Sequence, residues 1–573
     1  MMMQFFRSGR DTLRDTYVSA GNALSFLTVE VRGLQAAAYI LALSSFLSSI
    51  LALLRDRILA HLFGAGPELD MYYAAFRIPD LVFIAVGALV SAYMLIPEFA
   101  RRDDASQKKY LDTVIVGFSL LAAIIGGVAA FAAPTLLAYF FPTLAAASLD
   151  ELTLLTRILL LQATLLGFSN IAAAITQFKH RYTLYAASPI VYNFGIIAGA
   201  LWLYPQFGLN GLVWGVVAGA ALHVLIQIPS IFKDGFLRGV PLFYEPKAFF
   251  DTIRLSLPRA LALSMNQLAF FGLLSLAGAL SAGSISVFMF AYNLQGVPLS
   301  IIGASFATAA FPTLAYAFSR GESHIFLQQV CLAARQILFW SLPLISLMLV
   351  LRAHIVRTVL GSGAFDWTDT RLTAAAFALF ALSLAAQGLS LLLIRAFYAS
   401  GRTLAPFLVS GGTALLTLFL GTTFLRMVGN PSAGNFLEAF LRVEGIPGTA
   451  VLMLALAYAA SSIVGVLVLA LYFESRFGTF FAETKRAWWE SLVAAIGAGA
   501  AAYMTLHAIG DITLSSTLAS VVIRGGTAGL VGCVAAALVY YLLGSREFAE
   551  NIGALRKRIW RDVEPVASAE QSA

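Results

Sequence analysis

The sequence is poor in charge. Only 12% of its 573 residues are Asp, Glu, Lys or Arg, whereas 60% are hydrophobic, and the mean hydropathy is +0.83. An average soluble domain carries about 25% charged residues, and this chain has too few polar side chains to cover a water-facing fold of its length. The composition therefore excludes an ordinary soluble protein and predicts an all-α polytopic membrane protein.

Patterns typical of metal sites and of hydrolase or nucleotide chemistry are also missing. The six histidines are scattered without metal-ligand spacing, and neither a Walker-type loop nor a G-x-S-x-G elbow occurs. Paired carboxylates such as Asp103 and Asp104 lie mainly in expected loops. We expect no cofactor, no metal and no enzymatic activity. The two cysteines, Cys331 and Cys533, lie in separate apolar runs and are expected to be small core residues.

Apolar runs of about 20 residues recur along the whole chain, which is the pattern of transmembrane helices. A window of about that length predicts about 14 spans. They cover residues 34–62, 70–100, 111–140, 152–178, 182–205, 208–232, 256–281, 284–318, 328–352, 372–398, 403–427, 448–472, 485–507 and 518–543.

The basic residues alternate between loops. The net charge of +7 fits loops on one side of a membrane better than nucleic-acid binding. Loops near Arg101, Lys179 and Lys233 are basic, whereas those near 141–151 and 205–209 carry no Lys or Arg. This alternation predicts a multi-pass membrane protein with both termini in the cytoplasm. Five arginines on the expected outer side weaken the pattern in the second half: Arg352, Arg357, Arg371, Arg426 and Arg442.

A polar stretch at 233–256 separates six predicted spans from the rest, which suggests a transporter built from two helical bundles. Small residues predict close helix packing in the first bundle, where Gly211, Gly215 and Gly219 repeat every four residues. The expected segments are a cytoplasmic N-terminal segment at 1–33, an N-lobe at 34–238, a C-lobe at 239–475, two additional spans within 476–545, and a basic cytoplasmic tail at 546–573.

Charges inside apolar runs point to function, because each costs about 2.5–3.5 kcal/mol at the centre of a membrane helix on insertion scales. Asp70, Tyr73 and Arg77 are spaced to share one helix face. A structural role is possible for each charge: Arg55 could end the first span, and Asp70 could cap the second or pair with Arg77. For Arg55 and Arg77 we favour a cavity role, because guanidinium groups bind phosphate bidentately.

Uncharged polar side chains form a second group of candidates. Ser44, Ser45, Ser48 and Ser49 make a stripe along the first span toward Arg55. Amides within the spans could bind sugar or peptide groups, and they could equally form interhelical hydrogen bonds. These amides are Asn170, Asn193, Asn266, Gln267, Asn293, Gln295 and Gln387.

One stretch closely resembles the N-terminal signature of the MurJ/MviN family. It runs from Arg55 to Gly66 (RDRILAHLFGAG) and continues with Asp70, Tyr73 and the segment 75–80 (AFRIPD). Weaker matches follow at 298–321, which includes Phe-Pro-Thr-Leu at 311–314, and at 397–406, which begins Phe-Tyr and ends in Pro.

The resemblance implies a lipid II flippase. Members of the family move this undecaprenyl-pyrophosphate-linked peptidoglycan precursor across the cytoplasmic membrane, using two six-helix lobes around a central cavity and two extra helices. The implied partners are lipid II or a related glycolipid, membrane lipids and, as a further possibility, proteins of cell-wall synthesis. Two alternatives stay open: a flippase for another polyprenyl-linked glycan, and a non-transporting scaffold of wall synthesis.

The family's charged positions are only partly present here. Arg55, Asp70 and Arg77 match the family pattern, whereas arginine positions of the relatives fall on Ser49, Phe83 and Asn293. Arg259, at the start of the seventh predicted span, could return one cation to the cavity. The expected headgroup site therefore comprises Arg55, Arg77, Asp70, Arg259, Ser49 and Asn293.

Overall fold

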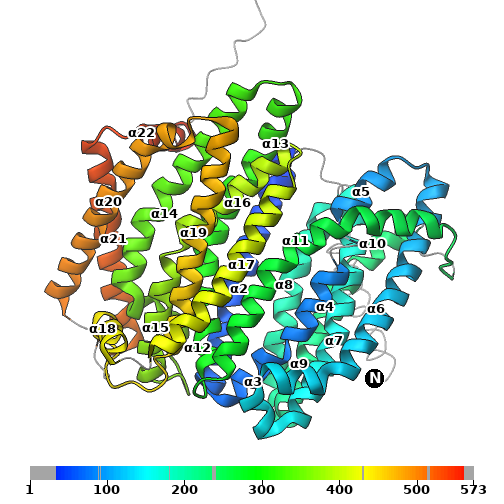
Figure 1. Cartoon of the computed structure of the whole chain (residues 1–573), viewed down its shortest axis with the longest axis horizontal. Helices are drawn as coiled ribbons and strands as arrows, with labels where there is room; N and C mark the ends of the chain where they lie inside the picture. Colours follow the sequence, from blue (N-terminus) through cyan, green and yellow to red (C-terminus); the bar gives the residue numbers. More distant parts are fainter. Residues whose placement is uncertain are drawn as a thin grey trace, which may run out of the picture. The chain divides into compact units, whose positions relative to one another are not determined.

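The computed structural model describes residues 34–87, 90, 92–179, 181–234, 236, 240–428, 431–510, 512 and 516–559. Within these ranges all regular structure is helical (Figure 1). This confirms the predicted all-α class. The predicted N-terminal segment at 1–33 and the last part of the predicted tail lie outside the described residues.

Each predicted span coincides with one or more helices. The helices of the first half are α2 (Leu34–Phe63), α3 (Pro67–Ala75), α4 (Arg77–Gly87), α5 (Ala92–Ala100), α6 (Asp104–Phe140), α7 (Pro142–Phe178), α8 (Tyr182–Ala198), the π-helical η2 (Gly199–Leu203), α9 (Tyr204–Leu225) and α10 (Ile228–Lys233). Those of the second half are α11 (Pro246–Gly278), α12 (Ser284–Leu299), the π-helical η3 (Ser300–Ala304), α13 (Ser305–Ser319), α14 (Ser323–Leu360), α15 (Trp367–Ala381), α16 (Leu384–Ala399), α17 (Leu404–Val428), α18 (Pro431–Leu441), α19 (Val451–Phe477), α20 (Phe480–Ile509), α21 (Leu518–Leu542) and α22 (Arg546–Ile559).

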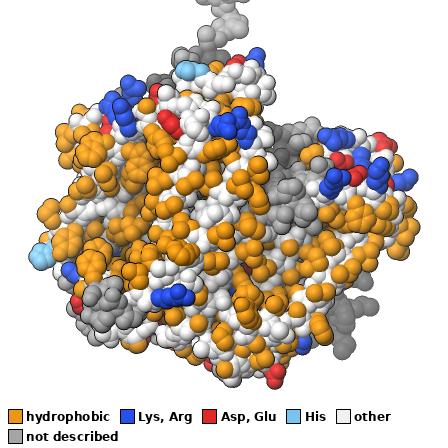
Figure 2. All heavy atoms as spheres, viewed as in Figure 1, with side chains coloured by type: hydrophobic (Ala, Val, Ile, Leu, Met, Phe, Trp, Pro, Cys, Tyr) orange, Lys and Arg blue, Asp and Glu red, His pale blue; other side chains and the backbone are white. Residues whose placement is uncertain are grey.

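Many of these helices are long and apolar enough to cross a membrane. In the described ranges nine helical runs have the required length and hydropathy, or up to ten if the bent pair α15 and α16 is one span. One run, Thr183–Lys233, contains two of the predicted spans. Figure 2 shows hydrophobic side chains spread widely over the visible surface, with Lys and Arg confined to a few groups. The chain is therefore a multi-pass membrane protein.

The second predicted span is broken into three helices. Helix α3 ends at Ala75, α4 begins at Arg77, and α5 follows with Pro97 inside it. Pro79 lies in the first turn of α4, where its missing N–H is tolerated, while its ring would obstruct a continuous helix through the preceding turn. Pro79 therefore accounts for the break between α3 and α4.

The described chain forms two compact units. Unit 1 contains residues up to Asn293 together with Val359–Thr373 and Ala414–Leu454, and unit 2 contains Leu294–Thr358, Ala374–Thr413 and the residues from Ala455 onward. Each unit has its own apolar core, around Tyr110 and Phe118 in unit 1 and around Phe326 and Phe397 in unit 2. The division into lobes at residue 238 stays a prediction.

Glycines bring α8 and α9 into close contact, as their spacing predicts. A Cβ on Gly195 would overlap the Cα of Gly219, and a Cβ on Gly199 would lie 2.6 Å from the Cα of Gly215. Both obstacles are backbone atoms, so they have little freedom to move aside. The repeat therefore serves backbone-to-backbone packing in unit 1.

The expectation for the cysteines is half right. Cys331 is buried in the core of unit 2, whereas Cys533 on α21 is exposed. An exposed cysteine is compatible with a lipid-facing helix, because lipid is as apolar as the protein interior. The basic stretch after residue 545 is helix α22, and it is anchored to α14 by the ion pair of Glu547 with Arg335 at 3.1 Å.

Candidate functional site

The predicted serine stripe lines a cavity in unit 1. Ser44, Ser45, Ser48 and Ser49 of α2 face residues 185–189 of α8 across a space of about 460 Å³. Ser44 donates a hydrogen bond to the carbonyl oxygen of Ala186 on α8. Ser49 itself donates to the carbonyl of Ser45 in the preceding turn (2.9 Å). Hydroxyl groups spaced by three or four residues thus give one wall of an otherwise apolar cavity a polar surface.

Arg55 lies further along α2, joined to this cavity wall by an amide. Its Nη1 donates to the Oδ1 of Asn193 on α8 at 3.2 Å, and the Nδ2 of Asn193 donates to the hydroxyl of Ser48 at 3.4 Å. The Arg55 side chain is 22% exposed. It is therefore only partly desolvated, although each of its three nitrogens already has an acceptor.

The nearest anion to Arg55 is its own neighbour in sequence. Asp56 Oδ1 accepts from both Nη2 and Nε of Arg55, at 2.8 and 3.0 Å. The other carboxylate oxygen of Asp56 accepts from Asn293 Nδ2 of α12 at 3.1 Å. The side chain of Asp56 is 4% exposed. Burial of this carboxylate is offset by its charged and amide partners.

These contacts form one continuous polar network within unit 1. It runs from Ser48 through Asn193, Arg55 and Asp56 to Asn293, and so connects helices α8, α2 and α12. The structure therefore brings together two predicted site residues, Arg55 and Asn293, and places Ser49 beside the Ser48 end of the network.

Arg77 makes its hydrogen bond and ion pair with residues outside this network. Its Nε donates to the carbonyl of Tyr73 at 3.0 Å, and its Nη2 lies 3.3 Å from Asp80 Oδ2. Its guanidinium also lies 5.8 Å from the ring centre of Phe270, a favourable cation–π distance. The residue is buried at 5% exposure. The suggested pairing of Arg77 with Asp70 is wrong, because Arg77 forms its ion pair with Asp80, three residues after it on the same helix.

Asp70 caps a helix, but not the second predicted span, which the structural alternative named. Its carboxylate accepts from the backbone N–H of Gly283 (2.6 Å) and from the N–H and hydroxyl of Ser286 (2.7 and 2.6 Å). These donors belong to the start of α12, whereas Asp70 itself lies inside α3. A carboxylate at a helix N-terminus stabilises the unpaired amides and the helix dipole. The contacts favour a structural role for Asp70.

The structure describes Arg259, the remaining predicted cation, only in part. Arg259 belongs to α11 by its backbone, but its side chain lies outside the described part of the chain. Its assignment to the headgroup site stays a prediction. Of the other arginines inside apolar runs, Arg57 donates to the carbonyl of Val359 at 3.1 Å, and Arg395 donates to Thr308 Oγ1 at 2.6 Å in unit 2.

Asp56 is the site residue that sequence reasoning missed. Its adjacency to Arg55 in the Arg-Asp signature is the sequence signal of such a pair. The sequence allows Asn193 either to bind sugar or peptide groups or to join helices, and the structure shows an interhelical hydrogen bond to Arg55. A partly exposed guanidinium with a buried carboxylate partner can exchange that partner for an incoming phosphate, since both are charge-assisted acceptors.

The sequence matches the family model described as "Lipid II flippase MurJ" over residues 59–522. Among curated proteins, it is 27% identical over 463 residues to a probable lipid II flippase MurJ of Thermotoga maritima, covering 77% of this chain and 92% of that protein. It is also 24% identical to the lipid II flippase MurJ of Burkholderia cenocepacia, over 68% of this chain and 78% of that one.

The fold agrees with solved structures. A lipid II flippase MurJ in an inward closed conformation superposes with a TM-score of 0.69, at 22% identity, over 90% of this chain and all of that one. An inward-facing multidrug transporter of the MATE family, within the MOP superfamily, superposes with a TM-score of 0.60 at 15% identity. The family match spans most of the chain and the fold is that of transporters, so the chain belongs to the lipid II flippase MurJ family.

Proposed function

We propose that this transporter carries lipid II from the inner to the outer leaflet by alternating access, with Arg55 as a contact for the pyrophosphate. One observation supports this most directly: the Arg55–Asp56–Asn293 network adjoins a serine-lined cavity in a membrane-embedded unit. A pyrophosphate carries several acceptor oxygens and suits the guanidinium fork. Hydroxyl and amide groups along the wall suit the sugar and peptide of the headgroup.

The proposed cycle turns on an exchange of partners at Arg55. Without cargo, Asp56 neutralises the guanidinium and Asn293 holds the other carboxylate oxygen. When pyrophosphate binds Arg55, that contact competes with the one to Asp56, and the link from α2 to α12 weakens. Binding energy from the cargo would in this way favour one conformation over another, which is the thermodynamic requirement for ligand-driven access change.

The orientation and associations of the chain belong to the same proposal. We propose that both termini lie in the cytoplasm, because basic residues gather in alternate loops. Membrane lipids surround the exposed apolar surface, and proteins of cell-wall synthesis are proposed as partners that consume the flipped precursor. The lobes proposed from sequence, at 34–238 and 239–475, would alternate in access, with the two spans in 476–545 added to them.

The test is depletion of this protein in its host, followed by an assay that reports the leaflet in which lipid II resides. We expect lipid II to accumulate facing the cytoplasm and the parent gene to restore export. Unchanged export after complete depletion would refute the flippase proposal. Accumulation of a different polyprenyl-linked glycan with normal lipid II export would instead identify that glycan as the cargo.

The role of Arg55 is tested by complementation with matched variants. Arg55→Gln should reduce export at least tenfold, because one charge-assisted contact to phosphate contributes about 1.5–3 kcal/mol. Arg55→Lys should retain part of the activity, since it keeps the charge without the fork. Arg57→Gln on the same helix is the control, because that guanidinium bonds a backbone carbonyl outside the network. Full activity of Arg55→Gln would remove Arg55 from the proposed site.

A further inference from the structure

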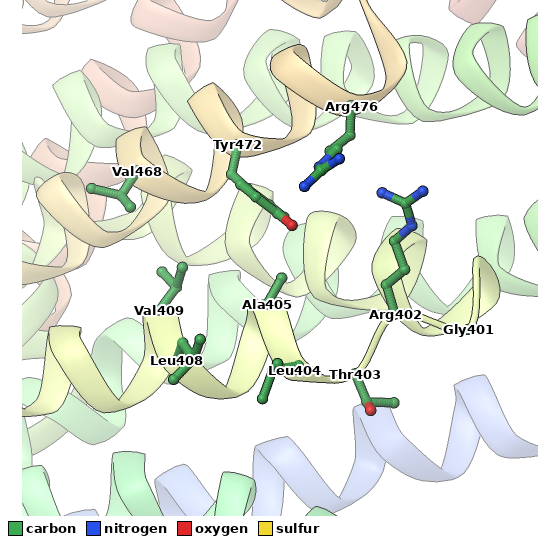
Figure 3. Close-up of a pocket in the computed structure, with 10 residues that line it drawn as sticks. All are labelled: Gly401, Arg402, Thr403, Leu404, Ala405, Leu408, Val409, Val468, Tyr472 and Arg476. Atoms are coloured by element: carbon green, nitrogen blue, oxygen red, sulfur yellow. The ribbon is translucent and has the colours of Figure 1, made fainter.

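Unit 2 contains a second cavity, built from helices that do not contribute to the Arg55 network. It has a volume of about 560 Å³ and lies between the turn at 401–403, the start of α17 and the last turns of α19 (Figure 3). Its mouth carries Arg402 and Arg476, and its floor is apolar. The turn belongs to the Phe-Tyr…Pro segment at 397–406, for which the proposed transport cycle supplies no role.

The two arginines face the same space. In Figure 3 their guanidinium groups point toward one another across the opening, and the hydroxyl of Tyr472 points into the same region. Both residues are exposed. Neither arginine takes part in an ion pair in the described part of the chain. Glu474, the carboxylate nearest to Arg476 in sequence, accepts a hydrogen bond from the backbone N–H of Phe481 at 2.9 Å. Two facing cations without an acid between them attract an anion.

Aromatic rings hold both guanidinium groups in place. The Arg476 guanidinium lies 5.4 Å from the ring centre of Tyr472, and that of Arg402 lies 5.5 Å from the ring centre of Phe477. Tyr472 in turn stacks on the fully buried Phe397 at 5.6 Å. Cation–π contact within about 6 Å is favourable, so the arginines are oriented before any ligand arrives.

The backbone fixes the position of Arg402 as well. Helix α16 ends with the N–H of Gly401 on the carbonyl of Tyr398 (3.0 Å) and the N–H of Arg402 on that of Phe397 (2.9 Å). Gly401 has a φ of +73°. This is the Schellman arrangement, in which glycine takes the left-handed position. The turn sends Arg402 back over the end of α16 toward α19.

The floor of the cavity continues onto the outer surface of the unit. It is lined by Leu404, Leu408 and Val409 of α17 and by Val468 of α19. Leu404 and Leu408 are 66% and 61% exposed. On a membrane helix such exposure places these side chains against acyl chains. A cationic mouth above an apolar, lipid-facing groove matches a molecule with an anionic head and a hydrocarbon tail.

We infer that this cavity binds an anionic glycerophospholipid, with its phosphate between Arg402 and Arg476 and an acyl chain along the groove formed by Leu404, Leu408 and Val468. The site is separate from the proposed cargo site and does not depend on it. Charge complementarity selects the headgroup, and the continuous apolar groove selects a lipid over a free anion.

The experiment uses the purified full-length chain in a neutral detergent, with native mass spectrometry to count bound lipids. Phosphatidylglycerol is compared with phosphatidylcholine of the same acyl chains. We expect preferential binding of one phosphatidylglycerol, and a loss of about tenfold or more in that preference for Arg402→Gln/Arg476→Gln. The control is Arg101→Gln/Arg320→Gln, which removes two exposed arginines that lie beside Glu98 and Glu322 and should keep the preference.

Three results would overturn the inference. The first is an equal preference for phosphatidylglycerol in the parent and the Arg402→Gln/Arg476→Gln protein. The second is displacement of the lipid by millimolar inorganic phosphate, which would indicate a site for a free anion. The third is an undiminished phosphatidylglycerol preference together with loss of undecaprenyl-pyrophosphate binding in the variant, which would make the cavity a cargo site.

Discussion

Arg55 shows how a charge is kept inside a membrane helix. Its guanidinium is bonded to Asp56 on the same helix and to Asn193 on α8, and the carboxylate is satisfied in turn by Asn293. A lone charge inside a membrane helix costs several kcal/mol, whereas a paired and hydrogen-bonded one costs much less. The network is therefore stable without cargo, and it contains a carboxylate that a pyrophosphate can replace.

This exchange predicts the behaviour of Asp56→Asn. Removing the carboxylate charge leaves Arg55 without its anion and should lower the free energy of unfolding by about 1–2 kcal/mol, less than for a fully buried pair because Arg55 is partly exposed. Added undecaprenyl pyrophosphate should supply the missing anion. Thermal unfolding in detergent should therefore show a larger ligand-induced rise in Tm for the variant than for the parent. Equal rises in Tm would contradict the exchange at Arg55.

Substitutions of Asp70 should lower stability without changing the response to ligand, because both carboxylate oxygens accept hydrogen bonds from other residues of the protein. Asp70→Ala leaves the N–H of Gly283 and both donors of Ser286 unsatisfied in a buried place. We expect a loss of about 2 kcal/mol or more in the free energy of unfolding. Asp70→Asn keeps one acceptor oxygen and should lose less.

Thermal unfolding distinguishes a structural from a ligand-binding role of Asp70. The ligand-induced change in Tm should stay the same in both Asp70 variants, with the exposed Asp104→Ala as the control. A smaller ligand response in Asp70→Asn with unchanged basal stability would instead return Asp70 to the headgroup site.

At the scale of helices, glycine decides how closely α8 and α9 approach. A Cβ on Gly215 of α9 would meet backbone atoms of Gly195 in α8 and of Gly199 in η2, which directly follows α8. Close approach increases van der Waals contact, which stabilises helix pairs where no hydrophobic effect acts between them. The same device recurs in unit 2, where a Cβ on Gly303 of η3 would lie 2.7 Å from the Cα of Gly388 on α16.

Gly215→Leu is therefore expected to push α8 and α9 apart. The expected loss is about 1–3 kcal/mol or more in the free energy of unfolding, as for other overpacked sites. Gly126→Leu on α6 is the matched control, because a side chain there meets nothing within 4 Å. The readout is the Tm of the purified proteins in the same detergent. A Tm for Gly215→Leu equal to that of the Gly126 control would show that the contact does not support the unit.

Helix breaks were predictable where proline causes them and not elsewhere. The break between α3 and α4 precedes Pro79, and local sterics are sufficient to explain it. The π-helical turns η2 and η3 were not predicted. Such turns insert a residue into the hydrogen-bond pattern, and the choice between regular and widened turns is made by packing against neighbouring helices. Periodicity at 3.6 residues per turn does not carry that information.

At the scale of the whole molecule, the proposed orientation predicts where the loops can be reached. In a Cys331→Ala/Cys533→Ala background, a cysteine replacing Glu444 should react with a membrane-impermeant maleimide in intact spheroplasts. A cysteine replacing Ser323 should react only after permeabilisation. Both positions are exposed, so accessibility within the fold is matched. Reversed labelling would show that the basic loops near Arg320 and Arg402 lie outside.

Composition and pattern by themselves determined that the chain is a multi-pass helical membrane protein, and the Arg55–Asp80 signature indicated the family to which it belongs. The number of membrane-spanning helices can be predicted from sequence because each apolar run of about 20 residues can span lipid independently of the others. For the same reason the candidate arginines could be selected, since any charge in such a run stands out.

Tertiary structure alone decided which partners those residues have. Asp70, a candidate for the headgroup site or for the cap of its own span, caps α12, which begins more than two hundred residues later. Arg77 pairs with Asp80, and Asp56 completes the Arg55 network with Asn293. Hydrogen bonds and ion pairs depend on distances of about 3 Å, and helices from distant parts of the sequence are brought to such distances only by packing. A single sequence specifies the side chains available to a site, and the packed helices determine which of them meet.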